Sequence, residues 1–124
     1  GAERNIKKAI ELYQLAVQLG NTDAMCNLGY CYSHGCGVEK DMKHAMRLYE
    51  QAAQGGDTSA LYNLGCCYHR GKGVEVDLAK AYEYYSKAAA CGHEKSITAL
   101  RKLARDMASR QSLSPQQVEP MQVQ

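Results

Sequence analysis

Residues 60–92 read ALYNLGCCYHRGKGVEVDLAKAYEYYSKAAACG, and a near copy of this stretch lies 36 residues earlier in the chain. That copy, residues 24–56, reads AMCNLGYCYSHGCGVEKDMKHAMRLYEQAAQGG and aligns without a gap. The two share a Leu-Gly pair, a Gly-x-Gly-Val motif, a following aspartate and a late Ala-Ala pair. Self-similarity at a fixed period of this length is typical of a helical solenoid, in which each repeat packs mainly on its neighbours.

Each copy predicts two helices joined by a glycine-containing loop, and the four expected helices cover residues 22–33, 42–54, 58–69 and 78–91. A side chain that can cap the free N–H groups stands just before each helix. These residues are Asn21, Asp41, Asp57 and Asp77. Gly29 and Gly65 fall inside helices, where glycine costs ~1 kcal/mol relative to alanine. We therefore expect the backbone of the partner helix to approach closely at both glycines.

The pattern continues in part on both sides of the two copies. Residues 5–19 predict one helix with an apolar face, equivalent to the second helix of a repeat whose first helix is missing. Arg101 replaces the glycine in the third pass, so residues 94–109 predict a longer, more charged capping helix. The predicted domain is a solenoid over residues 5–109, and its parts are a half repeat 5–20, repeats 21–56 and 57–92, and a capping helix 93–109. Residues 110–124 hold both prolines and predict a disordered tail.

Composition narrows the function classes. The 124 residues carry 15 lysines and arginines against 13 acidic residues, a net charge of +2, which gives no indication of nucleic-acid binding. No apolar run approaches the length of a membrane-spanning helix. The opening segment is amphipathic and contains Glu11, so it does not read as a secretion signal.

Six cysteines allow two interpretations, and they are Cys26, Cys31, Cys36, Cys66, Cys67 and Cys91. An even count in a short chain permits a disulfide framework with 15 pairings. Pairs five residues or one residue apart on a helix do not face each other, and buried cysteine behaves as a small hydrophobic residue. We favour free thiols in a reducing compartment.

The matching positions A-x3-LG-x2-Y-x2-G-x-GV-x2-D-x3-A, with the later Tyr and Ala-Ala-x2-Gly, resemble the Sel-one-like repeat family. This family is a variety of tetratricopeptide-like solenoid. The resemblance implies an all-α, right-handed α/α superhelix of about six antiparallel helices. It also implies a non-catalytic adaptor without a cofactor, which holds a protein or peptide partner on a concave face. Some bacterial members close each helix pair with a regularly spaced disulfide, but here only Cys31 and Cys67 recur at the period.

In the related tetratricopeptide geometry, the first helix of each repeat lines the concave groove. Carried over to this chain, the candidate partner-binding residues are Asn27, Tyr30, Tyr62, Asn63, Cys66, His69, Arg70, Lys102 and Arg105. The two asparagines can donate to and accept from a peptide backbone, and the two tyrosines offer flat apolar contact with a polar tip. The arginines and the lysine make one end of the groove basic, which suits a carboxylate.

Other chemistry is weakly supported. Cys31, His34 and Cys36 are close in sequence, and Cys67 and His69 partly repeat them, but no Cys-x2-Cys pair exists and we predict no metal site. A catalytic Cys/His dyad needs an oriented base and an oxyanion hole, and the sequence indicates neither. We therefore predict that the protein has no enzymatic activity. Two alternatives stay open. One is a cysteine-rich redox or metal-responsive protein. The other is a stacking segment of a larger repeat protein, whose uncovered N-terminal helix can drive self-association.

Overall fold

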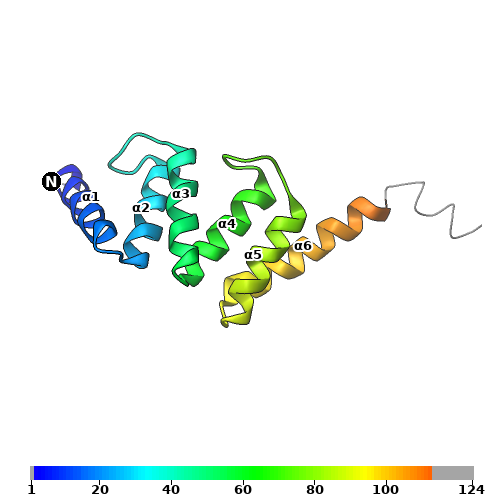
Figure 1. Ribbon diagram of the computed structural model, residues 1–124. Coiled ribbons are helices and arrows are strands. Elements are labelled where there is room, and N and C mark those ends of the chain that lie inside the picture. Colours follow the sequence, from blue (N-terminus) through cyan, green and yellow to red (C-terminus); the bar gives the residue numbers. More distant parts are fainter. Residues whose placement is uncertain (1, 113–124) are drawn as a thin grey trace, which may run out of the picture.

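The computed structural model describes residues 2–112 and, within them, the side chains of residues 4–110. This part of the chain forms six α-helices and no strand (Figure 1). The helices are α1 (Ala2–Gln18), α2 (Thr22–His34), α3 (Met42–Gln54), α4 (Thr58–Arg70), α5 (Leu78–Ala90) and α6 (Glu94–Ser112). They stack in chain order, with α1 at one end and α6 at the other. The predicted all-α solenoid is confirmed.

The capping residues act as predicted. Asn21 accepts a hydrogen bond from the Ala24 amide at 2.8 Å, and Asp57 accepts one from the Ala60 amide at 2.9 Å. The equivalent bonds at Asp41 and Asp77 are each 3.1 Å. Each bond satisfies one amide that lacks a partner within its helix, so α2 to α5 begin where the sequence predicts.

A fifth cap was not predicted. His93 stands one repeat after Asp57, and its Nδ1 accepts a bond of 3.3 Å from the amide of Ser96. The same nitrogen lies 2.8 Å from the Ser96 hydroxyl, and Ser96 is fully buried. Histidine therefore takes the capping place of asparagine and aspartate at the start of α6.

The glycine loops connect each repeat to the one before it. A Cβ on Gly37 would meet Ile6 and Ile10 of α1, and a Cβ on Gly73 would lie 2.9 Å from Cβ of Met42 of α3. Ile6 and Met42 are 36 residues apart, so the two loops make the same contact in successive repeats. Both loops lie on the same side of the stack (Figure 1). Both glycines have φ near +75°, a conformation that side chains rarely adopt.

The close approach at the helical glycines is made chiefly by a side chain, which corrects the prediction of a backbone contact. A Cβ on Gly29 would lie 2.8 Å from the ring of Tyr49. A Cβ on Gly65 would lie 2.5 Å from the ring of Tyr85. Each glycine thus leaves space for a tyrosine from the second helix of its own repeat, and both tyrosines are buried.

The core follows the stack as three clusters. Ile10, Leu28 and Leu48 form the first, with Val38 packed against them. Ala45, Tyr49, Leu64 and neighbouring residues form the second, against which Val74 packs. Ala81, Tyr85 and Leu103 form the third and fix α6 to α5. Interior packing is therefore shared between neighbouring repeats, as a solenoid requires.

The N-terminal helix has an uncovered apolar stripe, as predicted for a missing first helix. Its residues were not identified from the sequence: Leu12, Leu15 and Leu19 are 62%, 60% and 83% exposed. Leu48, one repeat after Leu12, is only 4% exposed because it packs against Ile10 and Leu28 of the preceding helices. Leu12 thus occupies a position that is buried between repeats, whereas the counterparts of Leu15 and Leu19, Gln51 and Gly55, are exposed.

At the other end, α6 continues to Ser112. Residues 110–112, which we assigned to the tail, are therefore helical. The rest of the predicted disordered tail, residues 113–124, lies outside the described residues.

Candidate functional site

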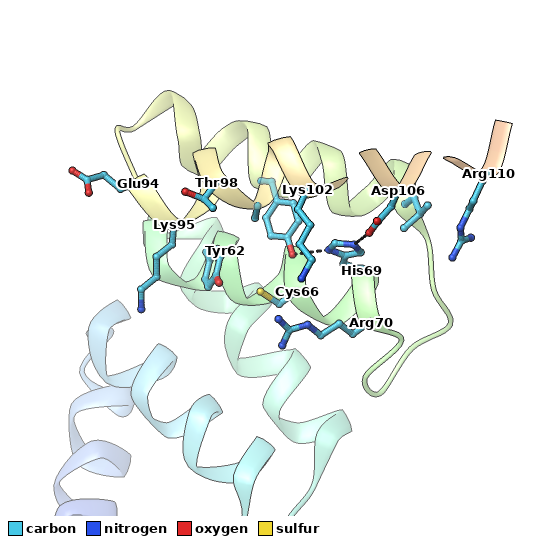
Figure 2. Close-up of a pocket in the computed structure, with 13 residues that line it drawn as sticks. Tyr62, Cys66, His69, Arg70, Glu94, Lys95, Thr98, Lys102, Asp106 and Arg110 are labelled. Atoms are coloured by element: carbon cyan, nitrogen blue, oxygen red, sulfur yellow. Dashed lines mark hydrogen bonds and ion pairs between the residues drawn. The ribbon is translucent and has the colours of Figure 1, made fainter. Parts of the chain in front are cut away.

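A hollow of about 710 Å³ lies between α4 and α6 (Figure 2). From α4 it is lined by Tyr62, Cys66, His69 and Arg70, spaced three and four residues apart on one helix face. The facing residues of α6 also share one face, and they are Glu94, Lys95, Thr98, Ala99, Lys102, Asp106 and Arg110. Leu78 and Tyr85 of α5 complete the lining.

A second hollow of about 530 Å³ lies between α2 and α4. It includes Tyr30 and His34 of α2, Asn63 of α4, and Lys40 and Lys72 from the two glycine loops. Tyr62, Cys66 and Arg70 line both hollows. The two hollows therefore adjoin, and we call them together the trough. It runs over the first helices of successive repeats, α2, α4 and α6.

Seven of the nine predicted partner-binding residues line the trough: Tyr30, Tyr62, Asn63, Cys66, His69, Arg70 and Lys102. Asn27 and Arg105 do not, and both are exposed elsewhere. Four basic residues of the lining were not predicted, and they are Lys40, Lys72, Lys95 and Arg110. None recurs at the 36-residue period, so the repeat pattern gives no signal for them.

The two repeated asparagines are not equivalent in the structure. The amide of Asn63 donates to Cys26 Sγ at 3.4 Å and so links α4 to α2. Asn27 is exposed and lies outside the trough. Of the two asparagines, only Asn63 lines the trough, and part of its hydrogen-bonding capacity is already used.

His69 joins three helices. Its Nε2 lies 2.8 Å from Asp106 Oδ2 of α6, and its Nδ1 lies 3.3 Å from the hydroxyl of Tyr85 (Figure 2). The carboxylate can only accept, so Nε2–H donates to Asp106, and in the neutral ring Nδ1 accepts from Tyr85. Burial raises the pKa of Tyr85, which keeps its hydroxyl protonated as a donor. One repeat earlier, Ser33 lies 3.4 Å from Tyr49 in the equivalent contact. His69 thus links α4 to both α5 and α6 at the edge of the trough.

The trough is basic. Its lining carries two carboxylates, Glu94 and Asp106, against six cationic side chains. The cations are Lys40, Arg70, Lys72, Lys95, Lys102 and Arg110. Figure 2 shows Arg70 and Lys102 projecting into the hollow from α4 and α6.

All six cysteines are free. Burial raises the pKa of both Cys26 and Cys67 to about 11, so these thiols stay protonated near neutral pH. Because the thiolate is the reactive form, neither is a ready nucleophile. Cys36 and Cys91 are exposed and lie outside the trough, whereas Cys66 lines it.

Two further classes of site are absent from the described part of the chain. No three histidine, cysteine or acidic side chains among residues 4–110 gather closely enough to hold a metal ion. None of the six helices combines the length and the apolar character needed to cross a bilayer.

The chain resembles known proteins in sequence and structure. The sequence model of the Sel1 repeat matches residues 1–21, 22–57 and 58–93. The Sel1 repeat protein from Oxalobacter formigenes is 31% identical and superposes with a TM-score of 0.73 over 76% of this chain. The protein c5321, a protective antigen present in uropathogenic Escherichia coli strains and displaying an SLR fold, is 27% identical, with a TM-score of 0.76 over 81% of this chain.

These matches cover 38% and 21% of the two solved chains, so this chain spans well under half the length of either. A search of curated protein sequences gives no significant match. The repeat model alone accounts for most of the sequence and falls on the same two periods that the internal alignment identified. The chain therefore belongs to the Sel1 repeat family, whose helical solenoids generally serve in protein–protein interaction.

Proposed function

We propose that this protein is a non-catalytic adaptor that binds a segment of another protein in the trough. The observation that carries the proposal is the adjoining of the two hollows at Tyr62, Cys66 and Arg70, which makes one binding surface across two repeats. Tyrosine and arginine are enriched among the residues that dominate binding energy at protein interfaces. The protonated state of Cys26 and Cys67 argues against the redox alternative for these two thiols.

Two tyrosines of nearly equal exposure provide a matched test. Tyr30 is 51% exposed and lines the trough, whereas Tyr82 is 54% exposed on α5 outside it. Proteins captured from the source organism by the wild-type chain should be lost with Tyr30→Ser and retained with Tyr82→Ser. For a purified partner, we expect Tyr30→Ser to raise Kd about tenfold, as for an interface anchor.

A footprint checks the same site independently. A bound partner should slow the alkylation of Cys66, which lines both hollows, while Cys36 and Cys91 continue to react. Equal loss of partner with both tyrosine variants, or an unprotected Cys66 in the complex, would place the binding surface elsewhere.

A second role, association through the N-terminal end, is favoured by the exposed stripe of Leu12, Leu15 and Leu19. We expect sedimentation velocity to show a concentration-dependent dimer, because burying large apolar side chains drives association. Leu12→Lys with Leu15→Lys should leave a monomer at all concentrations, while Lys7→Glu with Gln14→Glu on the same helix should not. A wild-type chain that stays monomeric at high concentration would rule this role out.

A further inference from the structure

The basic character of the trough is local. Six of the 15 lysines and arginines of the chain line the trough with only two of the 13 acidic residues. The rest of the sequence has the opposite charge balance, because it contains 11 acidic residues and nine basic ones. The small net charge of the whole protein therefore hides a separation of charge that favours an anionic ligand at this one surface.

Within the described part of the chain, the cations of the trough form no ion pair with an acidic side chain. Among residues 4–110 the structure has one ion pair, between His69 and Asp106. That pair occupies one of the only two carboxylates in the lining. The lysines that lie over tyrosine rings, Lys80 and Lys87, belong to α5 and lie outside the trough. With respect to residues 4–110, the six positive charges thus remain available to contact a ligand.

The placement of these charges suits an extended segment better than a small anion. Lys40 and Lys72 come from the glycine loops beside the second hollow, Lys95 and Lys102 come from α6 beside the first, and Arg70 belongs to both. A guanidinium can hold a carboxylate through two parallel hydrogen bonds, which makes Arg70 the central anchor. The basic side chains of the trough can therefore contact several carboxylates spaced along one extended segment.

Aromatic side chains interleave with the charges. Tyr30 is half exposed and stacks on His34 with ring centroids 4.0 Å apart, and Tyr62 lies 5.1 Å from the ring of His93. These rings give the peptide backbone and aliphatic side chains an apolar surface with polar tips.

We propose that the trough recognises an acidic protein segment, an extended stretch rich in aspartate and glutamate. This inference rests on the proposed function and adds the chemical class of the partner. The test is fluorescence anisotropy with a labelled peptide of alternating glutamate and serine, its glutamine counterpart, and an oligothymidylate carrying the same number of negative charges.

We expect the glutamate peptide to bind at least tenfold more tightly than the glutamine peptide at low salt. The difference should shrink at high salt, where exposed charges are screened beyond a few ångströms. Arg70→Gln with Lys102→Gln should weaken binding of the glutamate peptide about tenfold, since each removes one charged contact. The matched control, Lys43→Gln with Arg47→Gln, removes the same charge from exposed positions of α3 outside the trough and should change Kd less than twofold.

Three results would overturn the inference. The first is equal affinity for the glutamate and glutamine peptides, and the second is an equal loss of affinity with the two double variants. The third is tighter binding of the oligothymidylate, which would make the ligand a nucleic acid. If any of these occurs while Tyr30→Ser still releases the captured protein, the trough remains the binding surface and only the class of partner is wrong.

Discussion

Gly65→Ala is expected to lower the free energy of unfolding by about 2–3 kcal/mol, the range for forcing extra volume into a packed core. Helix propensity alone predicts the opposite sign, because alanine stabilises a helix interior by ~1 kcal/mol relative to glycine. The new Cβ would lie 2.5 Å from the ring of Tyr85, which is buried and fixed by its contacts with α4 and α6. Neither the helix backbone nor the ring can move away without opening the helix pair.

Urea unfolding followed by circular dichroism measures the effect. Gly56→Ala is the control: Gly56 has φ of +92° and nothing within 4 Å of its added Cβ. Its cost is therefore only the left-handed conformation, about 1 kcal/mol. Gly65→Ala combined with Tyr85→Leu should recover part of the lost stability. A Gly65→Ala protein as stable as wild type would show that the glycine is not kept for this contact.

The second large effect is expected at Leu103→Ala, with a loss of about 3 kcal/mol. Leu103 is fully buried against Ala81 and Tyr85, and it holds α6 to α5. Among the described helices, α6 packs on α5 and α4 only, so no further described helix compensates for the cavity. Hydrogen exchange should show faster exchange throughout α6 and little change in α2.

Ile97→Ala is the matched control on the same helix. Ile97 is 38% exposed, so its truncation should cost less than about 1 kcal/mol and leave exchange in α6 close to wild type. Equal losses from the two substitutions would mean that α6 is not anchored through Leu103. Since α6 forms one wall of the trough, Leu103→Ala should also weaken binding there.

Much of the fold was predictable because the repeat specifies it twice. Asn21 and Asp57 begin equivalent helices, and the glycine of each loop packs at the same place on the preceding repeat. A residue that recurs at a fixed spacing can be recognised as structurally important from the sequence alone, before its contacts are known. The glycine inside each helix was recognised in this way, although the tyrosine that fills its space was not, because the ring comes from another helix.

The candidate site was harder to predict where the repeat degenerates. Lys102 and Asp106 stand one repeat after Cys66 and Arg70, and all four line the trough. Arg105 stands one repeat after His69 yet is exposed elsewhere. His69 is held by Tyr85 of the next helix, whereas the described chain places no helix after α6 to hold the equivalent position.

The pairing of His69 with Asp106 could not be inferred either. It joins residues 37 positions apart and has no counterpart in the earlier repeat, where Ser33 takes the place of the histidine. The loop lysines escaped prediction for a related reason. Lys40 and Lys72 line the second hollow from the two glycine loops, a three-dimensional arrangement that periodicity does not encode.

Arginine stands at position 101, where the two earlier repeats have glycine, and this makes the two ends of the stack different. A tyrosine of a further second helix has no vacant space there, since Arg101 carries the side chain that Gly29 and Gly65 omit. At the opposite end, Leu12 of α1 is exposed at the position where Leu48, one repeat later, is buried between repeats. New repeats could therefore be added before α1 to lengthen this scaffold. Repeats added after α6 would first require Arg101→Gly.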